Sequence, residues 1–220
     1  MAKQVTFYYV RHGKTEFNRD GIIQGGRVDS PLVPETLPVL DRTAQALSAI
    51  DLAQCWCSPL GRAQASAERI LKDRKVPIRT LESLHEFDFG ELDGKGSAGH
   101  RLSFARHFVR QDFSDIGGES GDEVRSRVQH AFRKMFKEAR NGDSILVVAH
   151  GALLRSVLLE FSRMSQASRK LSALTMRVPN GSISTISGDG GKFVLRAMPT
   201  SADAFVPYVP VEDPELEDLF

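Results

Sequence analysis

One run of six residues restricts the fold more than any other part of this chain. Ser144–Ala149 reads Ser-Ile-Leu-Val-Val-Ala, an almost continuous series of apolar side chains. A strand of this kind is typical of the middle of a parallel sheet that helices cover on both faces. A second strand, Val5–Val10, leads into a polar, glycine-rich loop near the N-terminus. Together the two runs predict an α/β domain built around a mainly parallel sheet.

Strand and helix signals alternate along the rest of the chain. Helices are predicted where apolar residues recur every three or four positions, and strands where short apolar runs lie between turn residues. In chain order, the predicted elements are strands over 5–10, 52–57, 76–81, 144–149, 182–187 and 192–198, and helices over 35–49 and 62–72, from about 120 onward and after 151. This alternation predicts a three-layer sandwich with a mainly parallel central sheet.

Residues 1–200 are expected to form a single domain, because 220 residues suit one domain with an inserted lobe. The lobe is placed over 82–119, where four glycines are expected to break any long element, and we expect it to form a lid over the site. Residues 201–220 are rich in proline and acidic side chains and predict an extended or mobile tail.

The charge balance and the cysteines exclude several classes of function. The 29 basic and 28 acidic residues give a net charge of +1, which argues against nucleic-acid or membrane binding driven by overall charge. No apolar run reaches membrane-spanning length and no secretion signal is present, so a cytoplasmic location is expected. Cys55 and Cys57 have the wrong spacing for a redox or zinc motif, and we expect both to be buried in a strand.

Two histidines stand where predicted strands end. Arg11-His12-Gly13 follows the first strand, and Ala149-His150-Gly151 closes the apolar run before a helix. Ligands of parallel α/β sheets gather outside the carboxyl ends of the strands, so both histidines are expected to face one crevice. A single histidine in such a place is more often a hydrogen-bonded structural residue. Two in matching positions, one of them preceded by arginine, favour a functional site.

A second arginine strengthens the case for an anion. Arg62 stands at the start of the helix that follows the strand over 52–57. Taken alone it would be a solvated helix residue. A guanidinium suits phosphate because its planar fork donates two hydrogen bonds to two oxygens, so Arg11 and Arg62 are expected to form an anion clamp.

The chemistry that fits these residues is covalent phosphoryl transfer. A neutral imidazole such as that of His12 is a good nitrogen nucleophile, and cations stabilise the charge of the transferring group. The leaving alkoxide also needs a proton from a general acid. Glu86 is the leading candidate, because the aromatic residues beside it would raise its pKa by desolvation, and Asp88 is the rival.

These segments are similar in order and spacing to conserved blocks of one enzyme family, over residues 5 to about 187. The blocks are Arg11-His12-Gly13 with Thr15 and Asn18, Gln24-Gly25 with Asp29-Ser30-Pro31-Leu32, Ser58-Pro59-Leu60-Gly61-Arg62-Ala63, Leu84-x-Glu86-x-x-Phe89-Gly90, Gly117-Gly118-Glu119-Ser120 and Val147-Val148-Ala149-His150-Gly151. The chain therefore resembles the histidine phosphatase superfamily, the phosphoglycerate-mutase-like group. The resemblance implies a mainly parallel sheet with helices on both faces.

The resemblance also implies a role for each site residue. His12 would be the nucleophile, Glu86 the proton donor and later the base for an attacking water. The transferred group would be bound by Arg11, Arg62 and His150, and the substrate contacted by Asn18, Gln24, Gly25 and Gly151. No metal and no cofactor would be needed. The partner would be a small phosphorylated metabolite, with neither nucleic acid nor membrane involved, and a homodimer is left open.

The chain departs from the family pattern at three places. Lys14 replaces the usual acidic residue, and Val33-Pro34-Glu35-Thr36 changes the start of the helix over 35–49. The segment Lys95-Gly96-Ser97-Ala98-Gly99 matches no subgroup, so the part of the chain expected to set specificity cannot be interpreted.

Three functions remain open at this point. The first is a phosphatase for small phosphate monoesters. The second is a phosphoglycerate mutase that depends on a bisphosphorylated cofactor; Gln24-Gly25-Gly26 favours the phosphatase branch, since an aromatic residue usually follows the first glycine in mutases. The third is a catalytically weak module that binds phosphorylated ligands. The complete set of five catalytic candidates argues against this third function.

Overall fold

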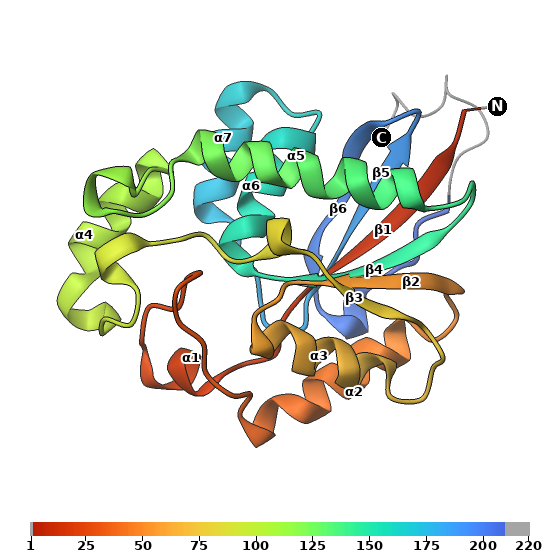
Figure 1. Cartoon of the computed structure of the whole chain (residues 1–220), viewed down its shortest axis with the longest axis horizontal. Helices are drawn as coiled ribbons and strands as arrows, with labels where there is room; N and C mark the ends of the chain where they lie inside the picture. Colours follow the sequence, from red (N-terminus) through yellow and green to blue (C-terminus); the bar gives the residue numbers. More distant parts are fainter. Residues whose placement is uncertain (1, 210–220) are drawn as a thin grey trace.

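A computed structural model describes residues 2–209, and within them the strands form one six-stranded sheet (Figure 1). The strands are β1 (Gln4–Arg11), β2 (Leu52–Cys57), β3 (Ile78–Thr80), β4 (Ser144–Ala149), β5 (Ile183–Asp189) and β6 (Lys192–Thr200). Their order is β3-β2-β4-β1-β5-β6; β1 to β4 are mutually parallel, whereas β5 runs antiparallel to both of its neighbours. The predicted mainly parallel sheet is confirmed.

The central strands bury side chains on both faces of the sheet. In β1, Phe7 and Tyr9 join one hydrophobic cluster, whereas Tyr8 and Val10 join the other. Every residue of β4 from Ile145 to Ala149 is fully buried, and these residues alternate between the same two clusters. The unbroken apolar run thus has the origin expected from the sequence, a strand with no solvent-facing side.

Helices form the two outer layers. One face of the sheet is covered by α2 (Leu37–Ala46) and α3 (Gly61–Leu71), and the other by α5 (Gly121–Glu138) and α6 (Gly151–Phe161) (Figure 1). Short 3₁₀ helices occur at Pro34–Thr36, Glu82–Leu84, Gly90–Leu92, Ser114–Ile116 and Ala202–Ala204. The three-layer sandwich predicted from the sequence is therefore present.

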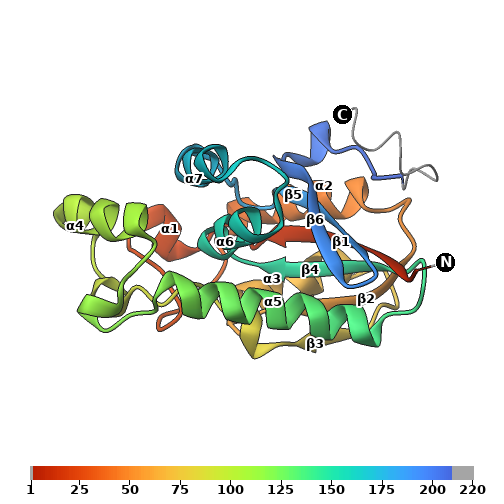
Figure 2. The ribbon, with the colours of Figure 1, turned by 90° about the horizontal axis from the view of Figure 1, so that it is seen from above.

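The segment 82–119 contains a long helix that the sequence analysis does not predict. Helix α4 (Ser97–Arg110) has 14 residues, although the glycines there were expected to break any long element. Gly96 is its N-cap and Gly99 lies in its first turn, so the glycines stand at the start of the helix and not in its interior. In both views α4 lies at the same end of the molecule as α1 (Glu16–Asp20) (Figures 1 and 2).

Two further helices were not predicted. In the loop after β1, the Thr15 side chain accepts from the Asn18 N–H and the Asn18 side chain from the Thr15 N–H, a capping box that starts α1. Helix α7 (Gln166–Thr175) follows α6 and starts at Ser165, whose side chain caps Ser168 N–H.

The cysteines and the chain ends complete the fold. Cys55 and Cys57 are free and fully buried on one face of β2, as predicted, and burial raises the pKa of the Cys57 thiol to about 11.

At the start of the predicted tail, the Phe205 ring packs edge-on against Tyr8, with centroids 5.9 Å apart. The rest of that tail, 210–220, lies outside the described residues. Over residues 2–209 the structure has no helix with the length and apolarity to cross a membrane.

Candidate active site

Parallel pairing of β1 with β4 brings the two predicted histidines together. Arg11 lies opposite Ala149 in the sheet, and His12 N–H donates to the Ala149 carbonyl at 2.9 Å. The rings of His12 and His150 are therefore neighbours, with centroids 5.2 Å apart. Both side chains are buried at the carboxyl ends of their strands. The sheet thus forms the crevice expected from the matching positions of the two histidines.

The hydrogen bonding of His12 leaves one ring nitrogen available. Its Nδ1 lies 2.7 Å from the Gly13 carbonyl oxygen, which can only accept, so Nδ1 carries the proton and Nε2 keeps its lone pair. Burial lowers the pKa of His12 well below 6.5, and the charges of Arg11 and Arg62 lower it further. The imidazole is therefore neutral near pH 7, the form in which Nε2 is a nucleophile.

His150 is held by contacts on both its ring and its backbone. Its Nε2 lies 2.7 Å from the Ser58 hydroxyl, while its Nδ1 is buried without a hydrogen-bond partner. The Tyr9 hydroxyl donates to the His150 carbonyl at 2.8 Å and accepts from its N–H at 3.0 Å. Burial and the charge of Arg62 lower the pKa of His150 well below 6.5. With the Ser58 hydroxyl donating to Nε2, Nδ1 carries a proton that no protein group accepts.

Arg62 is a buried guanidinium with a fixed orientation. Its side chain is fully buried and forms an ion pair with Asp29 at 2.8 Å. It also donates to the Val28 and Gly25 carbonyls, both at 2.9 Å, and its Nε has no partner. Gly25 thus contributes through its backbone, because a Cβ there would lie 2.4 Å from an Asp93 carboxylate oxygen. The ion pair and the two carbonyl contacts fix the guanidinium and leave its Nε–H without a partner.

Arg11 stands next to the helix start that follows His150. It donates to the Val178 carbonyl, and its Nε is buried without a partner. A Cβ on Gly151 would lie 3.2 Å from this Nε, so glycine leaves room for the guanidinium. Buried polar atoms are nearly always hydrogen-bonded in native proteins. Three partnerless polar atoms therefore mark this site, the Nε atoms of Arg11 and Arg62 and Nδ1 of His150, and all three suit an anion.

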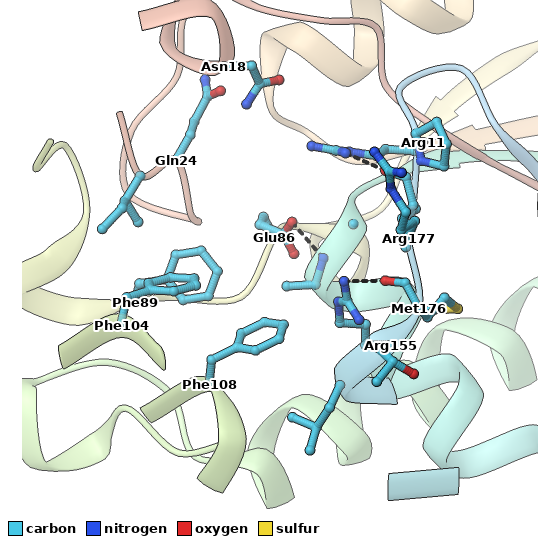
Figure 3. Close-up of a pocket in the computed structure, with 17 residues that line it drawn as sticks. Arg11, Asn18, Gln24, Glu86, Phe89, Phe104, Phe108, Arg155, Met176 and Arg177 are labelled. Carbon is cyan, nitrogen blue, oxygen red and sulfur yellow. Dashed lines mark hydrogen bonds between the residues drawn. The ribbon is translucent and has the colours of Figure 1, made fainter. Parts of the chain in front are cut away.

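A cavity of about 620 Å³ opens beside these groups (Figure 3). Five of the nine residues predicted for the site line it: Arg11, Asn18, Gln24, Glu86 and Gly151. The other four do not: His12, Gly25, Arg62 and His150 are buried. The predicted site residues therefore divide into a buried group around His12 and a group on the cavity wall.

The Glu86 carboxyl group contacts the N-terminus of a helix. The sequence around Glu86 did not indicate this contact. Its carboxyl group accepts from the N–H of Ala152 at 3.0 Å and of Leu153 at 2.9 Å, in the first turn of α6, and from the N–H of Phe87 at 2.9 Å. Of the aromatic rings near Glu86 in the sequence, Phe87 stacks on Phe89 with centroids 5.7 Å apart. The backbone donors fix the position of the carboxyl group at the cavity wall.

The rival acid, Asp88, is placed elsewhere. Its carboxylate pairs with Arg27 at 2.8 Å and accepts from the N–H of Gly90 at 2.8 Å, and it does not line the cavity. A partly buried ion pair holds the segment, since Arg127 binds Glu119 and donates to the carbonyls of His85 and Glu86. The block 117–120, through Glu119, thus positions the segment that carries Glu86.

Asn18 on α1 and Gln24 in the loop that follows it both line the cavity. Gln24 accepts from the Thr15 hydroxyl at 2.7 Å and donates to the Ser30 hydroxyl at 3.0 Å. Asn180, which the sequence analysis missed, donates to the His12 carbonyl at 2.9 Å and contacts Asn18 at 3.4 Å. Asn180 therefore links the backbone of His12 to Asn18 on the cavity wall.

Phe104, Phe108, Arg155 and Arg177 are among the lining residues that the sequence did not indicate. The two phenylalanines are four residues apart on α4, so they share a face of a helix that was not predicted. Arg155 stands four residues after Gly151, and this spacing alone places it on the same face of α6. No sequence pattern marks Arg177, which lies in the connection between α7 and β5.

Comparison with known proteins identifies the family. A model of the histidine phosphatase superfamily (branch 1) matches residues 7–200. This chain belongs to the histidine phosphatase superfamily. Every block quoted above for the resemblance falls within the matched range, so the family expected from the sequence is confirmed.

Individual relatives include both mutases and phosphatases. The 2,3-bisphosphoglycerate-dependent phosphoglycerate mutase of Parvibaculum lavamentivorans is 30% identical over 168 residues, which are 71% of this chain and 80% of that protein. The metal-independent phosphoserine phosphatase of Arabidopsis thaliana is 29% identical over 175 residues, 74% of this chain and 71% of that protein. The structure of YhfR from Bacillus stearothermophilus is 28% identical, has a TM-score of 0.76, and aligns with 88% of this chain and 96% of that one.

Acidification is expected to destabilise this histidine phosphatase through its two buried histidines. In the unfolded chain both protonate near pH 6.5, whereas the folded pKa values of His12 and His150 lie well below 6.5. The unfolded state therefore binds more protons below pH 6.5, and the free energy of unfolding falls as the pH decreases. The free energy of unfolding is measured with urea at pH 7 and at pH 5. Its decrease between the two pH values should be smaller for the double variant His12→Gln/His150→Gln than for the wild type. Equal falls in the two proteins would contradict this origin.

Proposed function

We propose that this histidine phosphatase superfamily member hydrolyses small phosphate monoesters through a phosphohistidine intermediate on Nε2 of His12. One observation carries the proposal: the free Nε2 of a neutral imidazole stands beside three buried polar atoms without protein partners. A phosphoryl group has the charge and the acceptor oxygens to satisfy them. Relatives that include a metal-independent phosphoserine phosphatase support the same reaction class.

In the first step, the Nε2 lone pair of His12 forms a bond to phosphorus while the bond to the leaving oxygen breaks. Charge spreads over the three equatorial oxygens, which Arg11, Arg62 and His150 stabilise. The electron pair of the broken bond stays on the leaving oxygen, and Glu86 supplies the proton that completes the alcohol.

Glu86 has one oxygen suited to this transfer. Its Oε1 accepts two hydrogen bonds, from Phe87 and Leu153, whereas Oε2 accepts one, from Ala152. Oε2 therefore keeps a free lone pair on the residue that lines the cavity, and we assign the transferred proton to it.

In the second step, a water molecule attacks the phosphohistidine while Glu86 takes one of its protons. The bond between phosphorus and Nε2 breaks, its electron pair returns to the ring, and phosphate leaves. His12 is again neutral and Glu86 again protonated, so the cycle closes without an external redox partner, and we propose that it needs no metal ion.

A mutase is the second candidate, because curated relatives about 30% identical are named as 2,3-bisphosphoglycerate-dependent mutases. The backbone at Gly26 favours the phosphatase. A Cβ on Gly26 would lie 2.9 Å from the Glu86 carbonyl, so the aromatic residue usual in mutases does not fit there without a shift of the acid segment.

An assay with 3-phosphoglycerate and a trace of 2,3-bisphosphoglycerate, in EDTA, separates the two candidates. The phosphatase proposal predicts that inorganic phosphate appears faster than the 2-isomer, and that a simple aryl phosphate is also hydrolysed. Formation of the 2-isomer faster than phosphate would establish the mutase instead. Tight binding of phosphate esters without turnover of either kind would indicate a binding module.

A further inference from the structure

The cavity beside Glu86 has a composition that phosphate alone does not explain. We propose, on the basis of the function proposed above, that the alcohol part of the preferred substrate is a planar apolar ring carrying a second anionic group. The ring packs against Phe104 and Phe108, and the anionic group meets Arg177. This assigns the choice of substrate to α4 and to the connection between α7 and β5.

The first wall of the cavity is aromatic. The rings of Phe104 and Phe108 lie nearly parallel, at 20° with centroids 5.4 Å apart, and Phe89 meets Phe104 edge-on at 5.0 Å. Phe104 and Phe108 are half-buried and line the cavity, so part of their surface faces it. Aromatic surface of this kind favours a planar apolar guest, through apolar burial and through stacked or edge-on ring contacts.

The opposite wall is partly apolar as well. Leu174, Met176 and Val178 line the cavity from the end of α7 and the segment after it. Figure 3 shows Met176 across the cavity from the Phe89, Phe104 and Phe108 rings. Glu86 lies between the two walls, so a leaving oxygen that meets Glu86 directs the rest of the alcohol into the space between them.

The charges of the lining are unbalanced. Three arginines and one carboxyl group line the cavity: Arg11, Arg155, Arg177 and Glu86. Arg11 belongs to the phosphate site. The Arg155 guanidinium is already engaged, since it donates to the Met176 carbonyl at 2.5 Å and lies over the Phe108 ring at 5.1 Å. Within residues 2–209, Arg177 is exposed and makes no hydrogen bond or ion pair, so its charge is available to a ligand.

Four substrates separate the two parts of the proposal. Phenyl phosphate has the ring alone, 3-phosphoglycerate has a carboxylate alone, 4-carboxyphenyl phosphate has both, and glycerol 3-phosphate has neither. The value of kcat/KM is measured for each substrate with the wild type, Phe108→Leu and Arg177→Gln. Comparing variant with wild type on one substrate cancels the different reactivities of phenols and alcohols.

Each variant should affect only the substrates that carry its feature. Arg177→Gln should lower kcat/KM roughly fivefold for the two carboxylates and leave the other two within about twofold. Phe108→Leu should lower it roughly tenfold for the two ring substrates only. Arg177→Lys should retain part of the carboxylate preference. Matched controls away from the cavity, Arg106→Gln on α4 and Phe136→Leu on α5, should change none of the four values.

The proposal and the underlying function fail in different ways. Suppose that the wild type turns over the substrates and that Arg177→Gln and Phe108→Leu each lower kcat/KM equally for all four. This result would overturn the assignment of specificity and leave the phosphatase function intact. Effects as small as those of the control variants would do the same. No hydrolysis of any of the four substrates by the wild type would instead contradict the proposed function, and the specificity with it.

Discussion

Replacing His12 by asparagine is expected to lower the rate of phosphate release by about 10⁴-fold or more, with every substrate. Asparagine can keep a donor near the position of Nδ1, so the contact with the Gly13 carbonyl is preserved while the attacking Nε2 is removed. His150 cannot take over, because its Nε2 is engaged by the Ser58 hydroxyl. The loss should therefore be chemical and not a consequence of misfolding.

The assay is release of phosphate from an aryl phosphate in EDTA. His130→Asn provides the matched control. His130 is an exposed residue of α5 and does not line the cavity. Its activity should equal that of the wild type. Activity of His12→Asn within about tenfold of the wild type would show that another group attacks phosphorus.

The second large effect is expected for Glu86→Gln, and its size should depend on the leaving group. With alkyl phosphates, kcat/KM should fall by about 10² to 10⁴-fold, because the alkoxide then leaves without a positioned acid. With 4-nitrophenyl phosphate the fall should be much smaller, since 4-nitrophenolate leaves without protonation. The glutamine also places an amide N–H₂ near the N–H of Ala152 or Leu153, which weakens the contact to α6 equally for all substrates.

The informative quantity is therefore the loss of kcat/KM with alkyl phosphates divided by the loss with 4-nitrophenyl phosphate. Glu86→Gln should also release a burst of 4-nitrophenol, because the phosphohistidine accumulates when water attack lacks its base. Asp88→Asn is the matched control and should change neither class strongly, given that Asp88 pairs with Arg27 outside the cavity. An equal loss for alkyl and aryl substrates would mean that Glu86 orients α6 and donates no proton.

The sequence predicted the sheet and the buried part of the site well, for a physical reason. A strand with both faces buried, such as β4, has to be apolar at every position, and this is visible without any structure. The ends of β1 and β4 then become neighbours because parallel pairing aligns Arg11 with Ala149. Residues directly after those strands, such as His12 and His150, follow from the topology.

The cavity walls could not be predicted in the same way. Phe104 and Phe108 depend on α4, whose glycines at 96 and 99 suggested an irregular lobe although they stand only at its start. Arg177 lies in a connection without periodicity, and its position depends on how α7 packs. The contact of Glu86 with α6 could not be predicted, because the first turn of that helix is close to Glu86 only in the folded structure.

The measurement that tests the central claim most directly is the trapping of the phosphoenzyme. The wild type is mixed with an aryl phosphate, quenched in alkali within one turnover, and the phosphorylated peptide is mapped by mass spectrometry. The account predicts one phosphoryl group on His12, stable to alkali and labile to acid, that forms at least as fast as turnover and is absent from His12→Asn. A phosphoryl group on any other residue, or full turnover without a phosphorylated enzyme, would contradict it.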